Sequence, residues 1–177
     1  MKELFITFAK FNKEADKTVY AILDGLSNEE REKDRGSYYK SLSGLFVHTL
    51  GGTVFLLGMM KDALGGSPAL AALSALGSVT VPQGGLDAGQ WKALGASFET
   101  ADDAYIQFVS SLRESDFNAP VTLAWYKGNP PSVPVAFMLQ QVTAHGTHHR
   151  GQISQILDSL KIDNDYSGIS PAFVPKL

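Results

Sequence analysis

Four long stretches of the chain carry apolar residues at helical spacing, and this pattern limits the possible folds more than any other feature. The stretches cover roughly residues 2–26, 38–62, 88–113 and 133–160. In each stretch apolar side chains recur every three or four residues, which places them on one face of a helix. Amphipathic helices bury such faces by packing against one another. The sequence therefore predicts an all-α fold, a four-helix bundle with long crossover connections.

Gly, Pro and polar residues mark the connections between the predicted helices. Polar residues 28–31 separate the first two helices, and residues 63–87 form a connection that is long for a bundle. Within it, Pro68 suits the first turn of a short helix over residues 68–73. Residues 121–126 predict a short strand, and Ser132 is the predicted N-cap of the last helix. Residues 163–177 are predicted to be irregular.

Length and composition favour a single domain over residues 1–177. The chain has 18 acidic and 15 basic residues and a net charge of −3, without a basic stripe, so we do not expect nucleic-acid binding. Without cysteine there are neither disulfides nor thiolate metal sites. We see no signal peptide and no run of about eighteen apolar residues. We therefore expect a cytoplasmic protein that does not span a membrane.

Three of the four histidines lie within the segment VTAHGTHHRGQ, residues 142–152. His145 and His149 are four residues apart and share the apolar face of the predicted last helix, while His148 is turned about 100° away from His149. His48 lies in the second predicted helix. It continues an apolar row formed by Leu45, Phe55 and Met59. The spacing thus predicts that His48, His145 and His149 project toward the bundle interior.

Two interpretations of these histidines remain open on spacing alone. A histidine on an apolar face is often an ordinary core residue, and an H-x-x-x-H pair does not require a metal. However, three buried imidazoles need hydrogen-bond partners, and Arg150 is the only charged residue between Pro130 and Leu157. A divalent cation would satisfy all three imidazoles, and three nitrogen ligands leave a position open, as in catalytic sites.

The string HGTHHRGQI, together with LFVHTLGG in the second predicted helix, resembles the DinB-like (YfiT-like) superfamily of metal-dependent bundle proteins. The likeness covers most of the chain, and H-x-x-H-H-R-G-Q-I is its most specific part. It implies a four-helix bundle in which His48, His145 and His149 bind zinc or nickel, with waters in the remaining positions. It also implies a homodimer and a low-molecular-weight thiol as partner. The chain departs from the family pattern at Phe11, where Trp is frequent, and in the long 63–87 connection.

Three further residues are candidates for a part in catalysis. His148 is either a proton shuttle or a surface residue. Arg150 either binds an anionic substrate group or anchors a carboxylate from another helix. Asp102 is either a partner that orients a ligand histidine or part of a solvated helix face.

Two further pairs of residues also allow more than one interpretation. Trp125 and Tyr126 line the mouth of a pocket, form a dimer contact or cap the core. The pair Gly51 and Gly52 allows either a close approach of two helices or room for an ion or ligand beside His48.

Three classes of function follow. The first is a metal-dependent enzyme, a thiol S-transferase or hydrolase that activates a thiol or water toward a small electrophilic substrate. The second is a non-catalytic stress or interaction protein with a structural metal, which the lack of a Glu directly after His145 favours. The third is a helical packing module without metal. We predict the first class, although the residues do not decide whether the chain catalyses a reaction.

Overall fold

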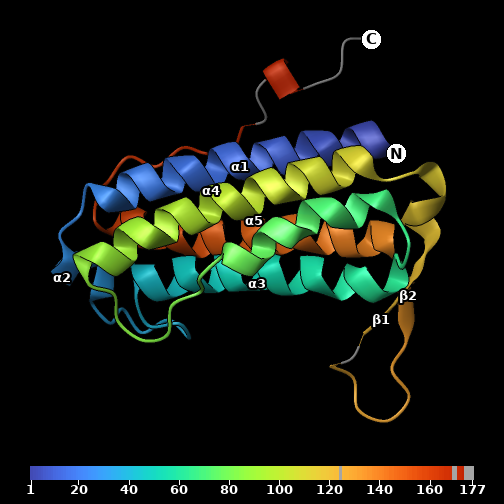
Figure 1. The fold of residues 1–177 in the computed structure, drawn as a ribbon. Helices are drawn as coiled ribbons and strands as arrows, with labels where there is room; N and C mark the ends of the chain where they lie inside the picture. Colours follow the sequence, from blue (N-terminus) through green and yellow to red (C-terminus); the bar gives the residue numbers. More distant parts are fainter. Residues whose placement is uncertain (124, 169–170, 174–177) are drawn as a thin grey trace.

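The chain folds as the predicted four-helix bundle in the computed structural model, which describes residues 1–123, 125–168 and 171–173 (Figure 1). The four long helices are α1 (Lys2–Asp24), α3 (Leu42–Ala63), α4 (Ala88–Ser111) and α5 (Val135–Ser159). The shorter elements are helix α2 (Asn28–Glu32), the 3₁₀ helices η1 (Pro68–Ser78), η2 (Glu114–Asn118) and η3 (Pro171–Phe173), and strands β1 (Pro120–Thr122) and β2 (Ser132–Pro134).

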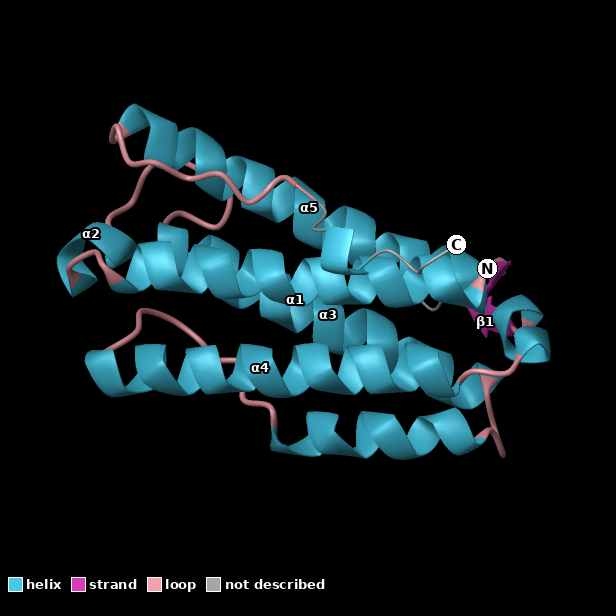
Figure 2. Cartoon of the chain, turned by 90° about the horizontal axis from the view of Figure 1, so that it is seen from above, coloured by secondary structure: helices cyan, strands magenta, loops and turns pink. Residues whose placement is uncertain are grey.

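The helices pack mainly as two pairs, α1 with α4 and α3 with α5, and contacts of α1 with α5 and of α3 with α4 close the bundle (Figures 1 and 2). Helices α3 and α4 follow one another in the chain but run in the same direction (Figure 1). Their connection must therefore return along the whole bundle. The 3₁₀ helix η1 makes much of this return and packs against α4, which explains why the 63–87 connection is so long.

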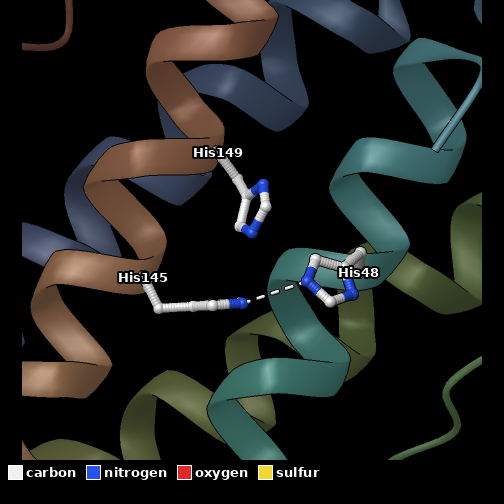
Figure 3. A group of neighbouring side chains, drawn as sticks. All are labelled: His48, His145 and His149. Carbon is white, nitrogen blue, oxygen red and sulfur yellow. Dashed lines mark hydrogen bonds between the residues drawn. The ribbon is translucent and has the colours of Figure 1, made fainter. Parts of the chain in front are cut away.

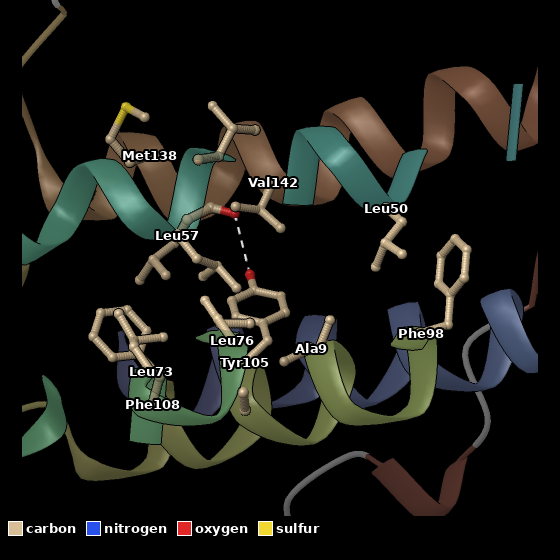
Figure 4. Close-up of a cluster of buried hydrophobic side chains, with 14 of the residues drawn as sticks. Ala9, Leu50, Leu57, Leu73, Leu76, Phe98, Tyr105, Phe108, Met138 and Val142 are labelled. Carbon is tan, nitrogen blue, oxygen red and sulfur yellow. Dashed lines mark hydrogen bonds between the residues drawn. The ribbon is translucent and has the colours of Figure 1, made fainter. Parts of the chain in front are cut away.

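The core lies between the two helix pairs and is filled mainly by leucine and aromatic side chains (Figure 4). Leu50 and Leu57 of α3 are fully buried, as are Phe108 and Tyr105 of α4. Burying one such side chain contributes about 1.5–3 kcal/mol. The Tyr105 hydroxyl donates a hydrogen bond of 3.2 Å to the Leu139 carbonyl of α5, so this polar atom is satisfied inside the core.

Side-chain caps fix the start of two long helices. Helix α3 begins after Ser41, whose hydroxyl accepts a hydrogen bond from the Gly44 amide at 3.0 Å. Residues 38–41, which we expected to be helical, therefore lie outside α3. Helix α4 begins with a capping box in which Asp87 and Gln90 each accept a hydrogen bond from the other's backbone amide.

The predicted N-cap of the last helix is wrong. Ser132 belongs to β2, which pairs antiparallel with β1 and brings Ser132 opposite Thr122. Helix α5 begins only after Pro134, without a side-chain cap, and the Val135 amide donates to the Ala119 carbonyl at 3.0 Å. The hairpin uses the residues that we expected to cap the helix.

Three other local predictions need correction. Residues 28–31, expected as a polar break, form most of α2 behind a Ser27 cap. The short helix predicted over residues 68–73 is the longer 3₁₀ helix η1, with Pro68 in its first turn. The strand predicted over residues 121–126 ends at Thr122, residue 124 lies outside the described residues, and η3 interrupts the tail that we expected to be irregular.

Helix α3 is long and apolar enough to cross a membrane by length and composition, with a mean hydropathy of 1.5. Half of its most apolar window is buried within the bundle, where α3 packs against α5, α4 and η1. A core helix of a bundle has the same composition. The expectation that the chain does not span a membrane stays a prediction.

Candidate metal centre

Three histidines from two neighbouring helices meet between α3 and α5 (Figure 3). His48 comes from α3, and His145 and His149 come from successive turns of α5. The Nε2 atoms of His48 and His145 are 3.1 Å apart, and one nitrogen from each of the three residues lies within 4.8 Å of the others. The structure thus brings together the three residues that we predicted as ligands. That they bind an ion stays a prediction.

The spacing of the nitrogens suits a shared ion. Zinc–imidazole bonds are about 2.0–2.1 Å long, so two nitrogens on one tetrahedral zinc ion lie about 3.3 Å apart. The separation of 3.1 Å between His48 and His145 is close to this value. Among the described residues, the group that could share an ion consists of these three histidines, without a carboxylate. Three imidazoles suit zinc and nickel alike, so the identity of the ion also stays a prediction.

The surroundings of the three imidazoles favour their neutral form. Burial, together with the neighbouring His149 and His48, lowers the pKa of His145 to about 4. Burial and His149 lower the pKa of His48, and burial lowers that of His149. Neutral imidazole is the form that binds metal. Near neutral pH the cluster therefore does not need to lose protons before it binds an ion.

Gln152 fixes the proton of His149. Its side-chain Oε1 lies 2.7 Å from His149 Nδ1, and an amide oxygen can only accept a hydrogen bond. The proton of neutral His149 is therefore held on Nδ1, which leaves the Nε2 lone pair free for an ion. Gln152 was not predicted, although its position three residues after His149 places it on the same face of the helix.

Gly52 makes room for the ring of His145. A Cβ atom at Gly52 would lie 2.0 Å from Cε1 and 2.5 Å from Nε2 of His145. The glycine thus allows a close approach, but of an imidazole to a helix rather than of two helix backbones. Its neighbour Gly51 faces Val81 instead, and a Cβ there would meet the valine at 3.4 Å.

Tyr39 packs against two histidines of the cluster. Its ring stacks on His48 with centroids 3.8 Å apart and meets His149 edge-on at 5.6 Å. Tyr39 lies in the connection that precedes α3 rather than in the helix that we expected over residues 38–62, and its contact with the histidines was not predicted. Its ring restricts the orientations open to His48.

The histidines are less deeply buried than their spacing predicted. Among the three, only His149 is fully buried, while His48 and His145 are half-buried. Phe55, which we placed in the same apolar row as His48, is 57% exposed. The row marks the edge of the buried face of α3, so the cluster sits near the surface of the bundle.

His148 stands apart from the cluster, as its position on the helix predicted. It is exposed on α5, and its ring meets that of His149 at 4.8 Å. Its exposure agrees with the surface interpretation, and no observation gives it a part in catalysis.

Arg150 anchors a carboxylate from another helix, one of its two predicted roles. Its guanidinium donates to Asp16 Oδ1 and to Asn12 Oδ1 of α1, both at 2.8 Å, and Arg150 and Asp16 are almost completely buried. Arg150 is therefore not available to bind an anionic substrate at the surface.

Asp102 fits neither of its predicted roles. It is buried rather than solvated, and its neighbours are Asp16, Asn12 and Arg150 rather than a histidine of the cluster. Burial and the nearby Asp16 carboxylate raise its pKa well above the ordinary value. Asp102 thus belongs to a buried polar network that includes the Arg150–Asp16 ion pair, where its surroundings favour the protonated form.

Trp125 and Tyr126 do not cap the core. They are 48% and 53% exposed, and Trp125 lies 6.1 Å from the exposed Phe55 ring. These aromatic rings form an exposed apolar group beside the hairpin. The interpretation as a core cap is wrong, and those as a pocket mouth and as a dimer contact stay predictions.

A cavity of about 630 Å³ adjoins the cluster at His48. It is lined by Tyr39 and by residues 81–85 of the long connection. Its volume is typical of sites for small molecules. The cluster therefore lies next to space that a substrate could occupy.

In comparison with protein families, the chain matches the model described as the DinB family over residues 1–160. This region contains the four long helices and all three clustered histidines. No curated protein matches the chain.

Proposed function

Because the chain belongs to the DinB family, we propose that His48, His145 and His149 hold a divalent metal ion, zinc or nickel, at the site of an enzymatic reaction. The reaction is a transfer to, or hydrolysis of, a small electrophilic substrate, with a low-molecular-weight thiol or water as nucleophile. One observation carries the proposal: three imidazole nitrogens from two helices lie within 4.8 Å of one another.

A divalent ion held by three imidazoles lowers the pKa of a bound water to about 7 or holds a thiol as its thiolate, and either provides a nucleophile at neutral pH. The protein residues prepare the site for this ion. Gln152 keeps the His149 proton on Nδ1, Tyr39 orients His48, and Gly52 lets the His145 ring approach α3.

The cavity beside His48 favours an enzyme over a protein with a structural metal. Structural zinc sites are usually closed by four protein ligands, whereas catalytic sites keep a position open for water or substrate. Here three ligands adjoin a cavity of about 630 Å³. A structural metal predicts that the chain unfolds when the metal is removed. The bundle has an extensive core away from the site, so we expect the fold to survive chelation.

The first test is the metal content of untagged protein purified without chelator, measured by elemental mass spectrometry. We expect about one zinc or nickel ion per chain. His149→Ala should lose most of the metal, because it removes one of three ligands. His148→Ala is the matched control, since this exposed neighbour lies outside the cluster, and it should retain most of the metal.

Equal loss from the two variants would contradict the assignment of the ligands. A wild-type protein that stays metal-free after titration with zinc and nickel would contradict the proposed function. Circular dichroism before and after chelation decides between the two roles of a bound ion, because only a structural role predicts loss of helix.

A further inference from the structure

The cavity beside His48 has walls from two segments that lie far apart in the sequence. One wall comes from α2 and the connection that follows it, with Glu32, Asp34 and Tyr39. The other wall is the loop of residues 81–85, which covers Gly51 of α3 and lies against Glu32 at Gly85. The unusually long 63–87 connection thus completes a pocket next to the metal centre. Its volume of about 630 Å³ suits a small organic molecule.

The charged side chains of this pocket favour a cation. Glu32 and Asp34 are acidic, and Lys40 is the one basic residue among the described lining residues. Lys40 is exposed. Arg150, which could have attracted an anion, is fully engaged in the buried ion pair with Asp16.

Glu32 is the carboxylate in this wall that lacks a partner. Asp34 accepts a hydrogen bond from the Gly36 amide at 2.9 Å, and the nearby Glu30 pairs with Arg35. In contrast, Glu32 Oε1 is shielded from solvent and has no hydrogen-bond partner among the described residues. Glu32 is partly buried and lines the cavity, so a small turn of its carboxylate brings it to a ligand there, and a charged donor on that ligand satisfies it.

We propose that this pocket binds the substrate of the metal centre and that Glu32 recognises an ammonium group on it. The substrate class is a small primary amine whose other end reaches the ion beside His48. The statement that the other end of the amine reaches an ion beside His48 rests on the function proposed above. Recognition of the ammonium group by Glu32 does not, because it uses residues that are not metal ligands.

The first experiment measures recognition of the ammonium group alone. The full-length protein, as purified, is titrated with n-butylammonium, butyrate or n-butanol while backbone amide shifts are followed by NMR. We expect n-butylammonium to cause saturable shifts at Gly84 and Gly85 of the pocket wall and to bind at least about tenfold more tightly than butyrate. Glu32→Gln should weaken this binding by about tenfold. Glu29→Gln, an exposed glutamate of the same short helix, should leave it unchanged.

The second experiment tests the same recognition at the metal. Cobalt-loaded protein is titrated with cysteamine or with 3-mercaptopropionate, which have the same two-carbon spacer but opposite charge. Thiolate–cobalt charge-transfer absorption reports binding. We expect cysteamine to bind at least about tenfold more tightly to the wild type and this preference to disappear in Glu32→Gln.

The outcomes separate the two proposals. Equal binding of butyrate and n-butylammonium, no saturable shift in the pocket, or an unchanged affinity in Glu32→Gln would overturn the assignment of Glu32. Thiols that bind cobalt without a preference for cysteamine would also overturn it, while supporting the proposed function. Saturable ammonium binding that depends on Glu32, in a protein that binds neither cobalt nor zinc, would support the amine site and overturn the metal-dependent function.

Discussion

At the scale of single residues, the arrangement of the three histidines depends on positions that are not themselves proposed ligands. Gly52 leaves the space that the His145 ring fills, Gln152 directs the His149 proton, and Tyr39 covers His48. The three histidines could be grouped from the sequence because helical spacing places side chains on faces. Tyr39 could not be predicted, because we expected it in a helix over residues 38–62, whereas its contact with His48 arises from the path of the connection before α3.

Replacement of Gly52 by alanine should separate metal binding from stability. The new methyl group would lie 2.0 Å from the His145 ring, so the ring must move away from His48. We expect a loss of at least about tenfold in metal affinity, as for other changes that misplace a ligand. Competition with a zinc chelator measures this affinity.

Gly58→Ala in the same helix is the control for Gly52→Ala. An added Cβ at Gly58 meets no neighbour within 4 Å, and alanine is the better helix former by about 1 kcal/mol. This variant should unfold at a higher urea concentration and keep the wild-type affinity. Unchanged affinity in Gly52→Ala would contradict the position of His145.

Gln152→Leu tests the hydrogen bond to His149. Without the amide oxygen the proton of His149 is free to move to Nε2, the nitrogen that the ion requires. We expect zinc affinity to fall by about 10- to 100-fold. The exposed Gln155 of the same helix provides the control Gln155→Leu, and a similar loss from both changes would argue against a specific role for Gln152.

At the scale of the elements, the buried Arg150–Asp16 pair joins α5 to α1 directly beside the proposed ligand His149. The four long helices were predictable because their apolar residues repeat over six or more turns. The start of α5 was not, because the β1–β2 hairpin extends through Pro134 and includes the expected cap. The partner of Arg150 could not be predicted from the sequence either, since Asp16 lies 134 positions away in the chain.

Arg150→Met should destabilise the bundle strongly. It leaves Asp16 buried without its cation, and breaking a buried pair in this way costs about 3–5 kcal/mol. Urea unfolding followed by circular dichroism measures the loss. Lys13→Met removes an ion pair between α1 and α4 that is partly exposed, so its expected cost is below about 1 kcal/mol. Similar losses of unfolding free energy in both variants would mean that the buried pair contributes no more to stability than the exposed one.

At the scale of the whole molecule, the buried polar network makes stability depend on pH. Asp16, Asp102 and Arg150 are all buried, and the guanidinium of Arg150 pairs with Asp16 while Asp102 lies close to both. Burial and the neighbouring Asp16 raise the pKa of Asp102. Folded Asp102 therefore holds a proton that the unfolded chain releases above a pH of about 4. Its contribution to stability is fully present below that pH and is lost as the pH rises toward the folded-state pKa, by up to about 1.4 kcal/mol per pH unit.

Asp102→Asn should remove this loss, because asparagine resembles the protonated acid and does not ionise. We expect the variant to have the same free energy of unfolding as the wild type at pH 4 and a larger one at pH 8, measured by urea unfolding at each pH. Asp103→Asn is the control. Asp103 is the next residue of α4, partly exposed and paired with Lys13, so its replacement should change stability by less than about 1 kcal/mol at either pH. A variant Asp102→Asn that is less stable than the wild type at pH 8 would show that the carboxylate is ionised and bound to Arg150 in the folded protein.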